Sequence, residues 1–345
     1  VENGQSWLVE PQRLDQSGAL WSPGVRNGVK EGSEYHLTEY FGPVLGIMTA
    51  RTLEEAIDMV NAIDYGLTSG IHSLDADEVG LWLENIHAGN LYVNRGTTGA
   101  IVQRQPFGGW KKSAVGPGTK AGGPNYLMGL GSWTTSTTPE TGLEPSSHQV
   151  QELLSHLEKS SELSRDDLTW LQHSSRLDEL AWNEEFGHAR DVSELGVERN
   201  ILRYSPVPVQ IRLSEKGSVN EALRVVVAGL RSGSEMSITV PDTVSSELLT
   251  ALRSTGHPVT VESDQSWTTT LSNAGKALTN ARIRLIGAPA SVVTAVTNGR
   301  PDVAVYDGDV VLAGRVELLP FVREQAVSIT AHRFGTPNYL SDTLI

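Results

Sequence analysis

Apolar and polar residues recur with two different periods along the chain, and the changes of period predict alternating strands and helices. The apolar run VLGIMTA at 44–50 has the length of a strand. In LEEAIDMVNAI at 53–63, apolar residues recur at spacings of three and four, which predicts a helix with one buried face. Thr52 with Glu55 three residues later predicts a capping box at the start of this helix.

The same order of elements continues toward residue 95. TSGIHSL at 68–74 predicts a strand, residues 75–87 predict a helix that ends before Gly89, and NLYVNR at 90–95 predicts another strand. Helices that alternate with short apolar strands indicate a mostly parallel sheet with both faces covered. The predicted fold class is therefore α/β.

A polar stretch without periodicity separates two such regions. SWTTSTTPETGLEPSS at 132–147 predicts an exposed linker. We divide the chain into residues 1–135, a linker at 136–148, and residues 149–345. After a helical segment at 149–185, the predicted strands are 207–213, 235–241, 257–263, 282–287 and 302–308. The helices predicted between them are 219–233, 245–256, 271–278 and 291–298. This order predicts a Rossmann-like α/β unit in the second half.

Composition narrows the function classes. A chain of 345 residues with 39% hydrophobic residues suits two globular domains, and a net charge of −14 argues against nucleic acid or an anionic membrane surface as the partner. The sequence has no membrane-length apolar run and no signal pattern, so we expect a cytoplasmic protein without membrane insertion. It contains no cysteine and no HExxH pair, so we expect no disulfide, no metal site and no cysteine nucleophile in this chain.

One glycine-rich string could suggest a dinucleotide site. Gly116, Gly118 and Ala121 in GPGTKAGG approach the spacing of that fingerprint. The string does not stand between a predicted strand and a predicted helix, so we assign no cofactor to it. The predicted strand at 207–213 is followed by Glu215–Gly217 without a fingerprint, so we expect the second domain to bind no NAD.

Four strings in the first half are EYFGPV at 39–44, GNLYVNRGTTGA at 89–100, QPFGGWKKS at 105–113 and KAGGPNYL at 120–127. In this order and spacing they resemble the C-terminal third of the aldehyde dehydrogenase superfamily. The TTGA and KAGGPNYL versions look like Δ1-pyrroline-5-carboxylate dehydrogenase, which oxidises L-glutamate γ-semialdehyde. The resemblance implies a bacterial, cytoplasmic, NAD-dependent enzyme with a small-molecule substrate.

The resemblance implies that two residues bind the cofactor. Glu39 matches a carboxylate that accepts hydrogen bonds from the nicotinamide ribose hydroxyls, and Phe41 matches an aromatic that packs against the nicotinamide ring. The structural alternatives are a surface carboxylate before a turn for Glu39 and a core aromatic for Phe41.

Three further residues match substrate-binding positions. Gly99 and Ala100 match a loop whose backbone N–H groups bind the carboxylate of the substrate, and glycine leaves room for such an approach. Phe107 matches an aromatic that lines the aldehyde pocket. The alternatives are a plain turn for the Gly99–Ala100 pair and ordinary core packing for Phe107.

Three strings in the second half, at 198–207, 314–328 and 329–335, look like the C-terminal domain of long proline utilization A proteins. Those proteins also contain a proline dehydrogenase, so FAD is implied only if such a domain lies upstream. In that family the extra domain is Rossmann-like, carries no cofactor and covers the dehydrogenase active site, with a terminal segment as part of a lid. The alternative is a domain that only stabilises the protein.

The implied chemistry needs groups that this chain lacks. A cysteine thiolate attacks the aldehyde, hydride passes to NAD, and a glutamate base assists release of the acid by water. Because the chain has no cysteine and starts at Val1 without methionine, we expect a fragment whose nucleophile, base and main NAD-binding unit lie upstream. We therefore assign no catalytic residue and expect the isolated chain to be inactive.

Two other functions stay open at this point. One is a non-catalytic structural or lid module, and the other is an aldehyde dehydrogenase with a different substrate. We expect contact with the upstream segment, and the apolar string NYLMGLGSW at 125–133 suggests a homodimer, because the family commonly pairs strands between subunits there.

Overall fold

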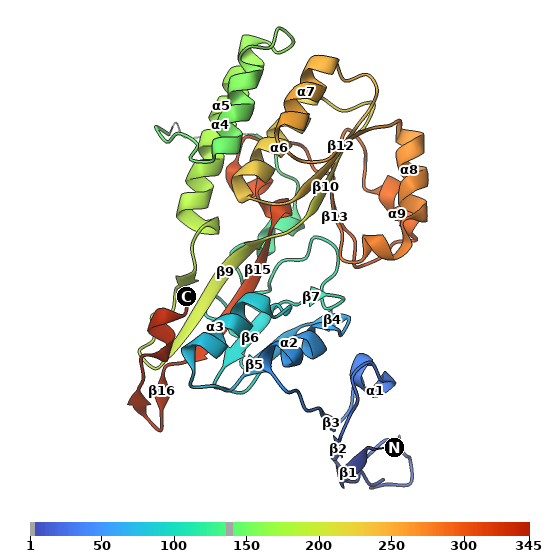
Figure 1. The fold of residues 1–345 in the computed structure, drawn as a ribbon, viewed down its shortest axis with the longest axis vertical. Coiled ribbons are helices and arrows are strands. Elements are labelled where there is room, and N and C mark those ends of the chain that lie inside the picture. The colour runs from blue at the N-terminus through green and yellow to red at the C-terminus, as the bar shows by residue number, and fades with distance from the viewer. Residues whose placement is uncertain (1–3, 136–140) are drawn as a thin grey trace.

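The computed structural model describes residues 4–135 and 141–345. Two bodies are connected by a long ribbon of two antiparallel strands, β9 (Glu198–Pro206) and β15 (Val322–Thr330) (Figure 1). One body contains most of the first half of the chain, and the other contains the parallel sheet of the second half. The predicted α/β class is confirmed.

The N-terminal residues form a small sheet that stands apart from both bodies in Figure 1. Its strands are β1 (Ser6–Val9), β2 (Gly24–Asn27) and β3 (Val44–Ile47). Strand β2 pairs antiparallel with β1 and parallel with β3, and the short helix α1 (Glu34–Leu37) lies in the crossover between β2 and β3. The strand predicted at 44–50 is therefore present but ends at Ile47.

The next four predicted elements form in the expected order. They are α2 (Leu53–Asn61), β5 (Thr68–Ile71), α3 (Ala76–Asn85) and β6 (Asn90–Val93), with the short pair β4 (Tyr65–Gly66) and β7 (Trp110–Lys111) beside them. The Thr52 side chain accepts a hydrogen bond from the Glu55 N–H, as predicted. The Glu55 carboxylate accepts a hydrogen bond from the N–H of Arg51 at 2.8 Å, and a weaker backbone hydrogen bond from Thr52 also contributes to the lowered pKa of Glu55.

The sheet that carries β6 combines both halves of the chain. Its strand order is β5-β6-β15-β9-β8, where β8 is Arg190–Asp191. Strand β6 runs parallel to β15, so Leu91 lies beside Val327, and β15 runs antiparallel to β9. The periodicity of the sequence did not predict these strand partners, because β6 and β15 are more than 200 residues apart and β9 and β15 are more than 100 residues apart. The division at 136–148 stays a prediction; residues 136–140 lie outside the described residues, and 141–147 contain no helix or strand.

The second half contains a five-stranded parallel sheet in the order β12-β11-β10-β13-β14, as expected for the Rossmann-like prediction. The strands are β10 (Val209–Leu213), β11 (Met236–Val240), β12 (Val259–Val261), β13 (Arg282–Ile286) and β14 (Ala304–Tyr306). Helices α6 (Val219–Ser232), α7 (Ser246–Ser254), α8 (Asp264–Asn273) and α9 (Ser291–Thr297) connect them. The helix predicted at 271–278 has the wrong bounds: the Ser263 side chain caps α8, which begins at Asp264, and residues 275–278 form a 3-10 turn. A Cβ at Gly229 would lie 2.1 Å from Met236 Sδ, so glycine allows α6 to pack closely on β11.

The helical segment predicted at 149–185 is divided. It forms α4 (His148–Leu157), α5 (Arg165–Ala181) and a π-helical turn at Trp182–Phe186. A separate helix, α5, begins at Arg165 because Ser164 and Asp167 form a complete capping box, which satisfies the first N–H groups of α5. The remaining helical turns are α10 (Gly314–Glu317) and the 3-10 turns Tyr126–Leu130, Gly275–Leu278, Leu319–Phe321 and Leu340–Thr343.

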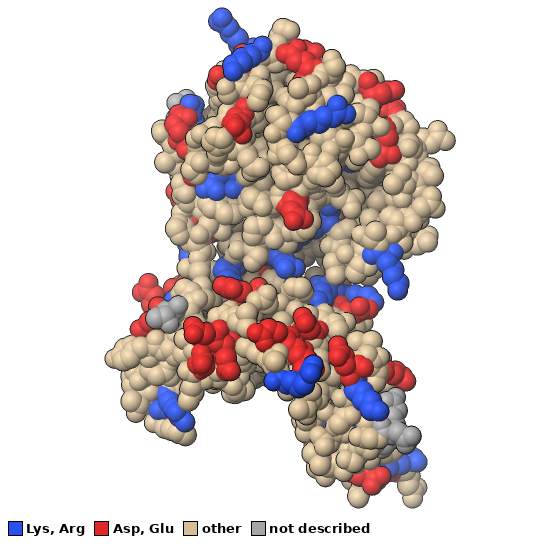
Figure 2. All heavy atoms as spheres, viewed as in Figure 1, with Lys and Arg blue, Asp and Glu red and all other residues tan. Residues whose placement is uncertain are grey.

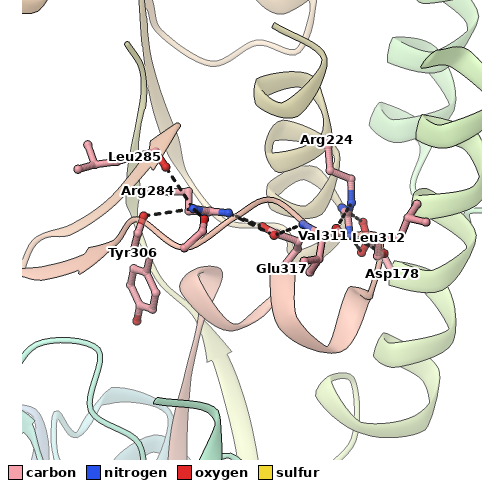
Figure 3. Close-up of polar contacts among 9 residues, drawn as sticks. Asp178, Arg224, Arg284, Leu285, Tyr306, Val311, Leu312 and Glu317 are labelled. Carbon is pink, nitrogen blue, oxygen red and sulfur yellow. Dashed lines mark hydrogen bonds and ion pairs between the residues drawn. The ribbon is translucent and has the colours of Figure 1, made fainter. Parts of the chain in front are cut away.

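Two buried ion pairs join elements of this unit: one joins α5 to α6, and the other joins β13 to α10 (Figure 3). The Arg224 guanidinium of α6 donates two hydrogen bonds of 2.7 Å to the carboxylate of Asp178 in α5, and both side chains are fully buried. Arg284 of β13 donates to Glu317 at 3.2 Å, and Glu317 also accepts from the N–H of Val311. Each buried charge therefore has an opposite charge, and the two arginines also donate to backbone carbonyls.

Candidate substrate and cofactor site

The two predicted cofactor residues lie in the turn between α1 and β3. Tyr40 stacks on Tyr35 with 5.4 Å between ring centroids, and its hydroxyl donates to Glu34 at 3.0 Å. Its neighbours Glu39 and Phe41 are exposed, and Phe41 is 99% exposed. Phe41 is therefore not part of a core formed by this chain. Among the described residues, the Glu39 carboxylate has no hydrogen-bond or ion-pair partner, so it is free to accept hydrogen bonds.

The predicted substrate residues lie in the connection between β6 and β7, residues 94–109, which we call the substrate loop. Gly99 has a φ of +103°, a conformation that side-chain-bearing residues rarely adopt. Ala100 is exposed. Beyond this pair the loop folds back, and Ile101 forms a β-bridge with Gln105. The backbone at Gly99 is therefore held in a specific turn and is open to a ligand.

Contacts on both sides of Gly99 hold the substrate loop. Asn94 has a φ of +57°, and its side chain donates to Ser73 O at 2.8 Å and accepts from Ser73 N at 3.0 Å. A Cβ at Gly70 would lie 3.0 Å from the methyl carbon of Thr97, so this part of the loop packs on β5. After Gly99, the N–H of Gln103 donates to Gly122 O at 2.9 Å. Hydrogen bonds and packing therefore hold the substrate loop both before and after Gly99.

Phe107 lies at the far end of the same loop and is half-buried. Its N–H and C=O form hydrogen bonds of 3.0 and 2.8 Å with Ala121. A Cβ at Gly108 would lie 3.2 Å from Lys120, so glycine permits this close packing. The substrate loop thus packs against the KAGG part of the 120–127 string.

Lys120 is a buried charged residue that the sequence analysis did not assign. Its side chain donates to Asn90 Oδ1 at 2.9 Å and to Gly108 O, and its N–H donates to Glu324 Oε2 at 2.8 Å. Burial lowers the pKa of Lys120 to about 7, although Glu324 opposes this change. Glu324 also accepts from the Asn125 side chain at 2.7 Å. A polar network therefore links the 120–127 string to β15, and only its position within a family-like string could have indicated Lys120.

The structure brings together three of the five predicted site residues. Gly99, Ala100 and Phe107 share the substrate loop, whereas Glu39 and Phe41 lie on the separate N-terminal sheet (Figure 1). Within residues 4–135 and 141–345, no hydrogen bond joins the two groups. A complete site would need another part of the protein to bring cofactor and substrate together.

A cleft of about 930 Å³ lies between the two bodies, lined by the 108–120 segment and by residues at the amino ends of β10, β11 and β13. Lys and Arg side chains are visible at the narrowing there in Figure 2. The Arg323 guanidinium lies 3.6 Å from the Trp110 ring centroid, and burial lowers its pKa to about 10. Gly116 and Gly118 line this cleft from a loop between β7 and the 3-10 turn at Tyr126, so the glycine string does not have the strand-to-helix setting of a dinucleotide fingerprint.

None of the helices in residues 4–135 and 141–345 combines the length and apolar character needed to cross a membrane. No group of three or more His, Cys, Asp or Glu side chains in the same ranges is arranged to hold a metal ion.

Comparison with known proteins relates the first part of the chain to a family. Residues 1–135 match the model of the aldehyde dehydrogenase family. A 1-pyrroline-5-carboxylate dehydrogenase of Bacillus thuringiensis (strain Al Hakam) is 41% identical over 125 residues, which cover 36% of this chain and 24% of that protein. This chain therefore spans about a quarter of the length of the curated relative.

The likeness to a solved structure extends over both halves. Proline Utilization A (PutA) from Corynebacterium freiburgense is 41% identical with a TM-score of 0.74, and the match covers 97% of this chain and 30% of that chain. A 1-pyrroline-5-carboxylate dehydrogenase from Thermus with bound NAD is 37% identical with a TM-score of 0.32, covering 34% of this chain and 22% of that chain. The resemblance inferred from the sequence strings is thus confirmed.

Proposed function

We propose that this chain is the C-terminal part of a bacterial, cytoplasmic, NAD-dependent L-glutamate γ-semialdehyde dehydrogenase that acts in proline catabolism. The observation that carries the proposal is the substrate loop, where Gly99 at φ +103° leaves backbone N–H groups accessible beside Ala100. Accessible N–H groups in such a turn form an anion-binding concavity, which suits the carboxylate of the semialdehyde. The 41% identity to a protein named 1-pyrroline-5-carboxylate dehydrogenase supports the same substrate class.

In this proposal the chain binds and orients while another segment performs the covalent chemistry. The exposed Glu39 carboxylate accepts hydrogen bonds from the ribose hydroxyls, and Phe41 covers one face of the nicotinamide. NAD, when bound, supplies the hydride acceptor. Gly99 and Ala100 hold the substrate carboxylate, and Phe107 packs along the aliphatic part. The chain has no cysteine, so the nucleophile and the general base belong to a segment upstream, and FAD enters only if a proline dehydrogenase domain also lies there.

The proposal is tested by NADH production in the full-length protein that contains this chain, with L-glutamate γ-semialdehyde and with propanal, which has no carboxylate. Gly99→Val should lower kcat/KM for the semialdehyde about 100-fold, since charge-assisted hydrogen bonds to the carboxylate are lost. Propanal turnover should change less than about twofold. Gly116→Val is the matched control, because Gly116 also has a positive φ, of +53°, and lies in a different loop.

Equal wild-type rates on both aldehydes would contradict the substrate assignment and favour a dehydrogenase with a different substrate. NADH formation by the 345 residues alone would contradict the assignment of nucleophile and base to an upstream segment.

We also propose that the terminal segment, residues 331–345, acts as part of a lid over the active site. The Arg199 guanidinium of β9 donates to Ser341 O and to Ile345 O, the latter at 2.8 Å. Leu344 and Ile345 pack against the core of the first body. Truncation after Thr330 should lower semialdehyde turnover while the parallel sheet stays folded by circular dichroism. Unchanged turnover would leave only the non-catalytic structural role for this segment.

A homodimer is part of the proposal as well. The string at 125–133 forms a 3-10 turn at Tyr126–Leu130, where we expected an intersubunit strand. It exposes large apolar side chains, with Leu127 and Leu130 each 71% exposed. Such side chains suit a protein interface. Sedimentation of the wild type and of Leu127→Ser would test whether this surface pairs subunits, and an unchanged oligomeric state would contradict it.

A further inference from the structure

One carboxylate contacts both sides of the substrate loop. Arg95 Nη1, just after β6, lies 2.8 Å from Glu198 Oε2. Arg104, on the returning side of the loop, contacts Oε1 of the same carboxylate. Glu198 is the first residue of β9, so a residue from the second half of the chain bridges the segment that contains Gly99 and Ala100.

Arg95, which Glu198 contacts, also lies next to the turn at Gly99. A Cβ at Gly99 would have only one neighbour within 4 Å among the described residues, Arg95 Nη2 at 3.6 Å, so the guanidinium that Glu198 holds lies directly beside the turn. Asn200 donates to Glu198 Oε1 at 3.1 Å, and Ser328 accepts from Arg95 while donating to Asn200 at 2.8 Å. The carboxylate is therefore fixed on its own strand pair, β9 and β15.

We propose that Glu198 is a positioning residue that preorganises the substrate loop for the carboxylate end of the aldehyde substrate. The inference rests on the proposed function, because it concerns how Gly99 and Ala100 are presented. A loop that is held by Glu198 on both sides has fewer conformations to lose when the ligand binds. Loss of the two Glu198 contacts should therefore weaken substrate binding more than it slows the chemical step, because the reacting aldehyde carbon lies at the opposite end of the substrate from the carboxylate.

The first experiment measures KM and kcat in the full-length protein. Glu198→Gln should raise KM for L-glutamate γ-semialdehyde about tenfold with kcat within about twofold, and should leave kcat/KM for propanal within about twofold. Glu198→Asp keeps the charge and should restore part of the loss. Asp264→Asn is the matched control, because it removes a carboxylate that pairs with Arg212 at 2.6 Å in the parallel-sheet unit.

The second experiment needs no substrate. Amide hydrogen exchange in residues 96–102 should be faster in Glu198→Gln than in the wild type and unchanged in Asp264→Asn. Unchanged exchange and KM in Glu198→Gln would overturn the proposal. Equal decreases in kcat/KM for both aldehydes, together with a lower melting temperature, would also overturn the proposal, because they would indicate that Glu198 has a purely structural role. If the wild-type protein does not prefer the semialdehyde, the proposed function is contradicted. The amide exchange rates of residues 96–102 would still show whether Glu198 holds the loop.

Discussion

Two arginine–carboxylate systems in this protein differ mainly in burial, and the difference separates fold stability from loop positioning. Asp178 and Arg224 lie between α5 and α6 and are fully buried. Glu198 is 13% exposed, and its partners Arg95 and Arg104 are 22% and 36% exposed. The arginines of the second system are partly open to water, so loss of Glu198 should cost less global stability than removal of one partner in the first, which leaves an uncompensated, fully buried charge. Similar chemistry thus stabilises a domain in one place and orients a loop in another.

The largest expected effect is on the buried pair. Asp178→Asn should lower the free energy of unfolding by about 3–5 kcal/mol, because Arg224 stays charged without a counter-ion. Glu198→Gln should lower it by less than about 1 kcal/mol. Urea unfolding of both variants measures the difference. The double variant Asp178→Leu with Arg224→Met removes both charges, so its free energy of unfolding should decrease less than that of Asp178→Asn. Equal decreases for Asp178→Asn and Glu198→Gln would contradict the comparison.

Lys120 should have an intermediate effect on the free energy of unfolding, and this effect should depend on pH. Its folded-state pKa of about 7 lies below the ordinary 10.5, so between these values the unfolded chain holds a proton that the folded chain has released. The free energy of unfolding should therefore rise with pH across this window, by up to about 1.4 kcal/mol per pH unit. Lys120→Met should lack this contribution. Urea unfolding at about pH 8 and about pH 9 compares the slopes, and identical slopes would show that Lys120 keeps its proton.

A smaller effect than that of Asp178→Asn is expected for local helix formation, which involves no ion pair. Thr52→Ala should lower the free energy of unfolding by about 1 kcal/mol, because the N–H of Glu55 loses its acceptor at the start of α2. Thr52→Ser keeps an oxygen at this place and serves as the control. Both variants should leave KM for the semialdehyde unchanged. A shift in KM would mean that α2 and the substrate loop are coupled.

Local patterns in the sequence were sufficient for most elements of the fold. The spacing of apolar residues predicted α2, α3, α6, α7 and α9, because a helix buries one face at a fixed period whatever it packs against. The helix predicted at 271–278 was misplaced, because α8 spans Asp264–Asn273. The division of the 149–185 segment was missed, although the capping box of Ser164 and Asp167 was visible in the sequence. Shared strings predicted the substrate loop, and the positive φ of Gly99 agrees with the choice of glycine there.

Contacts between distant segments were decided only by the tertiary structure. Pairing of β6 with β15 and contact of Glu198 with Arg95 and Arg104 depend on how the chain returns through the connecting ribbon, and no local periodicity records that path. The pKa of Lys120 likewise depends on burial by groups far away in sequence. The sequence by itself determined most elements of the parallel-sheet unit and of the 53–95 region, the α/β class and the family resemblance, since these follow from short-range spacing and composition. It did not predict the strands β9 and β15 of the connecting ribbon. Which charges are buried, and which carboxylate braces the loop, follows from the packing of the two halves.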